Sequence, residues 1–219
     1  MIIPEIHQGF FHVKNWIFDL GAVLLEWNPQ AILNVFTSNV DQHALLMREI
    51  FQHPDWLAMD RGQLSEEQAI PRAAQRTSLD YQQIKVLFDI VRESLTIIPD
   101  ALEILEKASA SGLNLYCLSN MSPKNYSYLK QKFNFFGHFH GVVISGLENT
   151  VKPEKQIYEI LLRRFSLNPE ESLFIDDRPE NILAAAELGM SVITFTASAD
   201  CYQKLSEALI SEQSILNQA

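Results

Sequence analysis

The chain has little cysteine, only two residues in 219, and this scarcity excludes a fold held together by a disulfide framework. Cys117 lies inside an apolar run, where a buried thiol is the ordinary interpretation, so we expect a reducing, cytoplasmic environment. No apolar run is long enough to cross a bilayer. Residues 1–15 also lack the basic start, apolar core and small-residue cleavage site of a secretory signal, so we expect neither secretion nor a membrane anchor.

Positive charge is scarce as well. The 17 Lys and Arg residues stand against 27 Asp and Glu residues, which gives a formal net charge of −10. Because this charge repels nucleic acid and anionic membranes at long range, we expect neither as a partner. A phosphate ligand would therefore need a cation supplied locally. Hydrophobic residues make up 47% of the chain, enough for one sizeable core and a small second lobe.

An apolar run from Trp16 to Leu25 is interrupted by a single carboxylate, Asp19. We interpret it as a buried strand that delivers Asp19 at its end, with Gly21 allowing the backbone to turn sharply and to approach a ligand. A carboxylate is costly to bury without a partner, and ligands collect at the ends of parallel strands. We therefore expect Asp19 to react, to hold a metal, or both.

From about residue 27 to residue 98 there is no strand signal, and apolar residues recur at the three- and four-residue spacing of helices. Ser65 and Gln68 form a capping-box pattern, and Asp60-Arg61-Gly62 is typical of a turn. This segment predicts an inserted α-helical cap domain at residues 27–95. The core domain would then consist of residues 1–26 and 96–219.

Strand patterns return in the second half of the chain and alternate with helical ones. This alternation predicts an α/β core with a doubly wound, Rossmann-like parallel sheet. Strands are expected at residues 113–118, 141–145, 172–175 and 191–195, and helices at 99–105, 124–132, 153–165 and 179–188.

Polar residues follow the apolar strands or precede a helix at four places along the chain: Asp19, Ser119-Asn120, Lys152-Pro153 and Asp176-Asp177. Strand-end groups in a parallel sheet gather at one edge. Crowded carboxylates favour a hard cation such as Mg²⁺, and we place Lys152 at a helix N-terminus, where an anion binds well. The set predicts phosphate binding, with one carboxylate free to attack phosphorus.

These four motifs, in this order, resemble those of the haloacid dehalogenase (HAD) superfamily, and most closely its phosphatases with a helical cap between the first two motifs. The resemblance implies that Asp19 is the nucleophile that forms an aspartyl-phosphate. It places Mg²⁺ on the Asp19 carboxylate, the Gly21 carbonyl and the Asp177 carboxylate. It also implies that Ser119 and the Asn120 amide bind the phosphate oxygens and that Lys152 neutralises charge between Asp19 and the phosphate. Asp176 and Asn181 would support the metal ligands without binding the metal directly.

One position departs from that pattern, because the family commonly has a second Asp where this chain has Gly21. That Asp protonates the leaving group, a contribution of roughly 10²–10⁴-fold, so alkyl phosphates should react slowly. Sugar-1-phosphate phosphatases that look like this chain also carry Asp-Leu-Gly, which makes a sugar phosphate the expected substrate. Candidates for shaping its pocket are Trp27, Trp56, Met59 and Arg61.

Several alternatives remain open at this point. The chain could be a 2-haloacid dehalogenase-like hydrolase, although that chemistry needs no metal and the Asp176-Asp177 pair argues against it. It could instead be a catalytically weak phosphate-binding or regulatory module. Asp176-Asp177 could also cap a helix, and His138 and His140 read as structural. We expect a monomer or a homodimer that acts on a small phosphorylated molecule.

Overall fold

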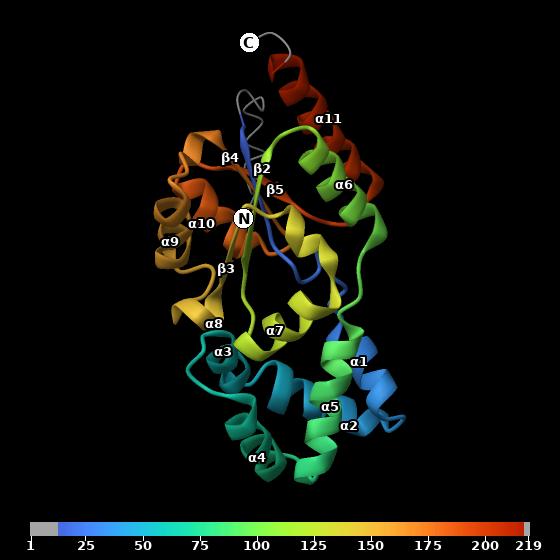
Figure 1. Cartoon of the computed structure of the whole chain (residues 1–219). Coiled ribbons are helices and arrows are strands. Elements are labelled where there is room, and N and C mark those ends of the chain that lie inside the picture. The colour runs from blue at the N-terminus through green and yellow to red at the C-terminus, as the bar shows by residue number, and fades with distance from the viewer. Residues whose placement is uncertain (1–12, 217–219) are drawn as a thin grey trace.

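A five-stranded parallel sheet forms the centre of the computed structural model, which describes residues 13–216 (Figure 1). The strand order is β3-β2-β1-β4-β5, so the first strand is central and the chain winds outward from it on both sides. This is the doubly wound α/β class that the sequence predicts. The strands are β1 (Asn15–Phe18), β2 (Asn114–Ser119), β3 (Gly141–Ile144), β4 (Ser172–Asp176) and β5 (Ser191–Thr194).

Both faces of the sheet are apolar and both are covered by helices. Trp16 and Phe18 of β1 pack in the core beneath α6 (Pro99–Ala110) and α11 (Ala199–Leu216), whereas Ile17 between them packs beneath α9 (Lys155–Phe165) and α10 (Pro179–Glu187). Successive strand residues point to opposite faces, so a sheet buried on both sides requires an unbroken apolar run. Cys117 and Cys201 are both buried and free, as expected for Cys117.

The apolar run that begins the chain's core is a strand only as far as Phe18. Beyond Asp19 the backbone closes on itself, because the Leu20 carbonyl accepts the N–H groups of Leu24 and Leu25 at 2.9 and 2.8 Å. The left-handed residue of this turn is Ala22, with φ of 57°, and not Gly21. The expectation that Gly21 makes the sharp turn possible is therefore wrong.

Five α-helices and one π-helical turn lie between β1 and α6, and we call residues 29–94 the helical lobe (Figure 1). The lobe has its own apolar core, in which Ile32, Leu87 and Met59 are buried. Ser65 and Gln68 form the predicted capping box. The elements are α1 (Pro29–Phe36), α2 (Val40–Leu46), η1 (Met47–Phe51), α3 (Pro54–Asp60), α4 (Glu66–Arg76) and α5 (Tyr81–Ser94).

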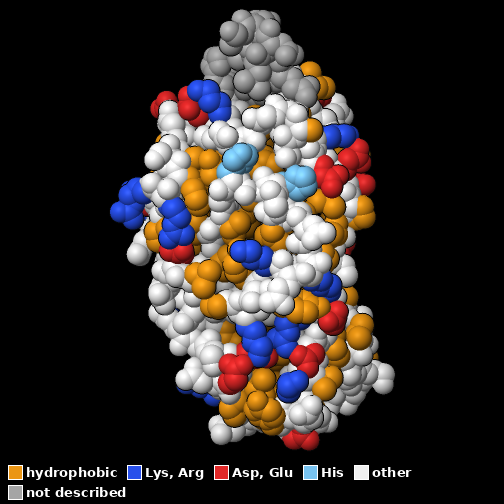
Figure 2. All heavy atoms as spheres, in the orientation of Figure 1, with side chains coloured by type: hydrophobic (Ala, Val, Ile, Leu, Met, Phe, Trp, Pro, Cys, Tyr) orange, Lys and Arg blue, Asp and Glu red, His pale blue; other side chains and the backbone are white. Residues whose placement is uncertain are grey.

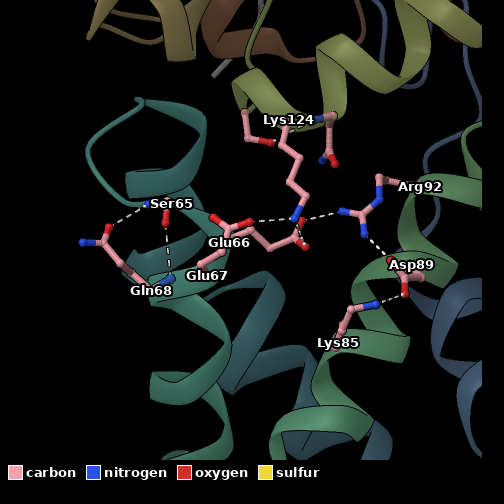
Figure 3. A network of polar contacts seen from close by, with 10 residues as sticks. Ser65, Glu66, Glu67, Gln68, Lys85, Asp89, Arg92 and Lys124 are labelled. Carbon is pink, nitrogen blue, oxygen red and sulfur yellow. Dashed lines mark hydrogen bonds and ion pairs between the residues drawn. The ribbon is translucent and has the colours of Figure 1, made fainter.

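Charged side chains join the lobe to the core. Lys124, on α7 (Pro123–Lys132), reaches Glu66 and Glu67 of α4 at 2.9 and 2.8 Å, and Arg92 of α5 pairs with the same Glu66 (Figure 3). Glu66 is buried, and a buried carboxylate is costly unless it is paired; here two cations, Lys124 and Arg92, pair with it. Figure 2, in the orientation of Figure 1, shows basic and acidic side chains gathered together on the lower part of the visible surface. The junction is therefore built from paired charges rather than from one sign.

Two expectations from the sequence concern other parts of the molecule. His138 and His140 are structural, since His140 Nδ1 accepts the Leu115 N–H at 3.1 Å and His138 Nδ1 contacts Ser109 Oγ at 3.1 Å. Within residues 13–216, the structure contains no helix of the length and apolarity that spanning a bilayer requires. Residues 1–12, which include most of the segment without a secretory signal, lie outside the described part of the chain.

Candidate active site

Asp19 follows directly on β1, and its side chain is 9% exposed. Its backbone N–H donates to the Ile175 carbonyl at 3.0 Å, which continues the pairing of β1 with β4 by one residue. Asp176 therefore lies beside it, at the end of β4. Asp19 Oδ1 also accepts the Leu20 N–H at 2.7 Å. Two neighbouring parallel strands thus present two carboxylates at one edge of the sheet, as the sequence predicts.

Lys152 lies between these two carboxylates. Its Nζ is 2.9 Å from Asp19 Oδ1 and 2.6 Å from Asp176 Oδ2, and it donates to the Leu118 carbonyl at 2.9 Å. The side chain is 1% exposed. Burial acts to lower the pKa of the ammonium, but the two carboxylates outweigh it and the pKa is raised. Lys152 therefore stays charged in the interior of the site.

Lys152 does not lie at a helix N-terminus, so that expectation is wrong. Helix α9 begins at Lys155 with Glu154 as its N-cap residue. Lys152 is held instead by Asn120, whose side-chain amide donates to the Lys152 carbonyl at 2.9 Å and accepts the Lys152 N–H at 2.8 Å. Because Asn120 follows the neighbouring strand β2, far from Lys152 in the sequence, no local sequence pattern predicts this contact.

Asp176 is fully buried and is supported from behind. The Asn181 side chain donates to its two carboxylate oxygens at 2.9 and 3.1 Å, and the Arg178 N–H donates to Oδ1 at 2.9 Å. The Tyr158 hydroxyl in turn donates to the Asn181 carbonyl at 3.0 Å. The N-cap residue of α10 is Arg178, which makes no side-chain capping bond, so neither Asp176 nor Asp177 is the N-cap residue.

A third carboxylate completes the cluster. Asp19, Asp176 and Asp177 place oxygen atoms within 4.8 Å of one another. Burial, together with the other two carboxylates, raises the pKa of Asp177 to about 6. Burial also raises the pKa of Asp19 against the opposing effect of Lys152. Three carboxylates share one ammonium, and this excess of hard oxygen donors suits a divalent cation such as Mg²⁺.

Ser119 ends β2 beside this cluster, and its side chain hydrogen-bonds to Asp19. It is 1% exposed, so its hydroxyl has no access to bulk water. All eight residues singled out from the sequence are thus found in one region: Asp19, Gly21, Ser119, Asn120, Lys152, Asp176, Asp177 and Asn181. All of them except Asp176, which lies beneath, line a single cavity of about 600 Å³.

The helical lobe forms the other wall of this cavity, and most of what it contributes is apolar. Of the four residues expected to shape the pocket, Trp27 and Trp56 line it, whereas Met59 and Arg61 do not. Met59 is buried in the lobe's own core, and Arg61 pairs with Glu154. The other apolar lining residues are Pro29, Met47, Phe51, Pro54, Leu57, Leu95 and Met121.

Asp60, the last residue of α3, is the carboxylate of the cavity that sequence reasoning missed. Burial raises its pKa to about 7, a hydrogen bond from the Ser122 backbone acts against this, and Asp19 adds to it. In the sequence Asp60 begins an Asp-Arg-Gly turn, and a turn alone accounts for an aspartate at this position. The signal that could have identified Asp60 is its place in a turn of the lobe that must face the core.

This fold and this site define a class of protein: an α/β protein with a carboxylate and an ammonium in contact at the carboxyl ends of its parallel strands. The family model for haloacid dehalogenase-like hydrolases matches residues 17–189. The chain belongs to this family and is a hydrolase.

Individual relatives agree with this assignment. The chain is 27% identical over 187 residues to the sesquiterpene phosphatase astK of Aspergillus oryzae, a match that covers 84% of this chain and 91% of that protein. It is 36% identical over 101 residues to enolase-phosphatase E1 of Aquifex aeolicus, which covers 43% of each. A HAD-family enzyme of Bacteroides thetaiotaomicron, solved with magnesium and inorganic phosphate, has the same fold. Its TM-score is 0.69 at 22% identity, covering 86% of this chain and 96% of that one.

Proposed function

We propose that this hydrolase is a Mg²⁺-dependent phosphatase that cleaves a small phosphomonoester through an aspartyl-phosphate on Asp19. The observation that carries the proposal is the buried contact of Lys152 with both Asp19 and Asp176, with Asp177 and Ser119 adjoining. Phosphoryl transfer needs chiefly positioning and charge neutralisation, and these groups supply both. Phosphatases among the relatives add support.

The metal site in this proposal consists of the Asp19 and Asp177 carboxylates and the main-chain carbonyl of Gly21. The fit rests on the donor set, since three carboxylates within 4.8 Å are matched by a single ammonium. When bound, Mg²⁺ neutralises charge on the phosphate and draws it toward the nucleophile. Asp176, held by Asn181, keeps the ion-paired Lys152 in place.

The residues of the chain have distinct tasks in this proposal. Asp19 attacks phosphorus with the carboxylate oxygen that does not pair with Lys152. The ammonium of Lys152 holds Asp19 in one orientation and neutralises charge between it and the phosphate. Ser119 and the Asn120 N–H bind phosphate oxygens. Residues 27–95 act as a cap domain on the core formed by residues 1–26 and 96–219, and closure excludes water.

Two substrate classes fit different features of the site. The first is a sugar 1-phosphate. Gly21 stands where the family commonly has an acid, and an anomeric oxygen leaves with little help from an acid. The cavity favours a different class, since Trp27, Phe51 and Trp56 line it, with ring centroids 5.0–6.0 Å apart. An apolar organic group would bury against such a wall. We therefore place a phosphate ester with an apolar organic group first; the sesquiterpene phosphatase relative supports this choice.

The alternatives predict different behaviour. A 2-haloacid dehalogenase would have no use for Asp177 beside Asp19 and would work without metal. A phosphate-binding module would bind phosphate without turning over an ester.

The test is turnover of an aryl phosphate, a farnesyl-type phosphate and a sugar 1-phosphate, each with Mg²⁺ and with chelator, by the wild type and Asp19→Asn. The proposal requires Mg²⁺-dependent turnover that Asp19→Asn abolishes. Metal-independent release of halide would support the dehalogenase instead. Phosphate binding without any turnover would support the binding module.

A further inference from the structure

The chain lacks the usual proton donor of its family at Gly21, yet an alkyl phosphate needs one. We propose that Asp60, from the helical lobe, supplies this proton to the leaving oxygen and then activates water against the aspartyl-phosphate. The inference rests on the proposed phosphatase function. It concerns a residue of α3, about forty positions from the motif that normally holds the acid.

The first support is how firmly the end of α3 is fixed to the core. The Asp60 carbonyl accepts a hydrogen bond from Ser145 Oγ at 2.5 Å, and the same Oγ accepts the Met121 N–H at 2.9 Å. Arg61 makes a bidentate pair with Glu154 at 2.7 and 2.6 Å. A Cβ on Gly62 would lie 2.2 Å from the Gly146 carbonyl oxygen, so the two backbones touch. Asp60 is thus placed by the core itself.

The second support is where its carboxyl group lies. Asp60 lines the cavity together with Asp19, Ser119 and Asn120, and it takes a hydrogen bond from the Ser122 backbone. Ser122 follows the Ser119-Asn120 pair by two residues, so the carboxyl group lies over the loop that binds phosphate. The leaving oxygen of a phosphate attacked by Asp19 points away from the core, toward the lobe. Asp60 is on that side.

The third support is elimination among the ionisable side chains that line the cavity. Asp19, Asp177 and Lys152 already have tasks, and an arginine does not release its proton. His53 and Asp60 remain. His53 begins α3, where its Nδ1 accepts the Asp55 N–H at 3.1 Å, so its ring is engaged as a helix cap. Asp60, in contrast, accepts a hydrogen bond from the Ser122 backbone, two residues after the Ser119-Asn120 pair.

Its protonation suits the task. Burial and the nearby charge of Asp19 raise its pKa to about 7, against the effect of the Ser122 N–H, and a bound phosphate adds further negative charge. The other ionisable groups that line the cavity are Asp19, His53, Lys152, Asp177 and Arg178, and the Arg61–Glu154 pair follows Asp60 at the turn. A carboxyl group with a pKa near neutral pH can donate its proton to the leaving alkoxide and later accept a proton from water.

The step balances as follows. An Asp19 oxygen forms a bond to phosphorus, the bond from phosphorus to the ester oxygen breaks, and its electron pair stays on that oxygen. The Asp60 proton transfers to this oxygen and releases the alcohol. Asp60, now a carboxylate, takes a proton from water as the water oxygen attacks phosphorus. The Asp19–phosphorus bond breaks, and inorganic phosphate leaves.

The experiment compares the rate of phosphoenzyme formation from an alkyl phosphate and from an activated aryl phosphate in the wild type and Asp60→Asn. An aryl leaving group departs without a proton. We expect Asp60→Asn to slow the alkyl reaction by about 10²–10⁴-fold, and to leave the aryl burst within about threefold while slowing the steady state after it. An equal loss on both substrates would overturn the inference.

Two further variants separate chemistry from structure. At Gly21 an added Cβ meets only Trp27 atoms, at 3.8 and 4.0 Å, so a side chain fits there. Gly21→Asp in the Asp60→Asn background restores the family's acid and should recover most of the alkyl rate. Arg61→Gln disturbs the docking of the turn but keeps the carboxyl group, so it should slow the alkyl reaction more than the aryl burst, and by less than Asp60→Asn does. A selective alkyl loss in His53→Gln instead of Asp60→Asn would overturn the inference and leave the proposed function intact. No turnover by the wild type would overturn both.

Discussion

A buried lysine between two buried aspartates is the residue-level feature on which the site depends. Lys152 makes three contacts and Asp176 is fully buried, so none of these charges is exposed to solvent. Burying ions costs several kcal/mol each, and it is repaid only when every partner is in place. The arrangement is therefore better explained by orientation of Asp19 than by stability.

Asp177 is the least compensated carboxylate of the cluster. Its pKa is raised to about 6 by burial and by Asp19 and Asp176. Asp177→Asn removes this repulsion, so we expect the metal-free protein to melt a few degrees higher. The same change should abolish the rise in Tm that Mg²⁺ gives the wild type, because binding to the native state alone stabilises it.

Thermal melting with chelator and with Mg²⁺ measures both effects. Glu170→Gln, at the opposite end of β4, removes the same charge outside the cluster and should change neither quantity. An unchanged Mg²⁺ response in Asp177→Asn would contradict the placing of the metal.

Asp60 gives stability a pH dependence of unusual sign. Its pKa is raised from 3.8 to about 7, first by burial, so the native state holds a proton that the unfolded state has lost. Stability from this group is therefore present at low pH and falls as the pH rises through about 7. We expect Asp60→Asn to raise Tm by a few degrees at pH 8.5 and by much less at pH 5. A difference that is the same at both pH values would contradict the raised pKa.

At the scale of elements, the contact between the α3–α4 turn and α8 (Ser145–Glu148) connects the lobe to the site. Gly62→Ala places a Cβ 2.2 Å from the Gly146 carbonyl oxygen and must push the turn away. Because Asp60 would move with the turn, we expect a drop in kcat of at least about tenfold for an alkyl phosphate.

The matched control is Gly112→Ala. Gly112 has nearly the same backbone angle, φ of 80° against 77°, but no atom within 4 Å of an added Cβ. Both variants should lose about 1–2 kcal/mol of stability from the left-handed backbone. Only Gly62→Ala should lose activity, and an equal loss in Gly112→Ala would sink the account of the contact.

Elements governed by local patterns were predictable. The strands that end at Phe18, Ser119 and Asp176 follow from unbroken apolar runs, and the Ser65–Gln68 capping box follows from its i, i+3 spacing. Lys152 was wrongly placed at a helix N-terminus because the residue that holds it, Asn120, is 32 residues away. The role of Asp60 was invisible because it depends on Ser145, 85 residues away. Contacts at such separations leave no periodic trace in one sequence.

At the scale of the whole molecule, the proposed function requires a chain of net charge −10 to bind an anion, so positive charge must be supplied locally. Lys152 would provide part of it, and a metal ion held by the carboxylate cluster would provide the rest. The lobe closes over this charged floor with an apolar wall. In the proposed reaction the core would supply the nucleophile and the metal ligands, and the lobe would supply the proton donor Asp60 and the apolar wall that selects the organic group.

The most direct test of this account is to locate the phosphoryl group in protein quenched with acid during turnover of an aryl phosphate with Mg²⁺. The account predicts phosphate on the peptide that contains Asp19, and neither adduct nor turnover in Asp19→Asn. Turnover that persists in Asp19→Asn, without any phosphorylated peptide in the wild type, would contradict it.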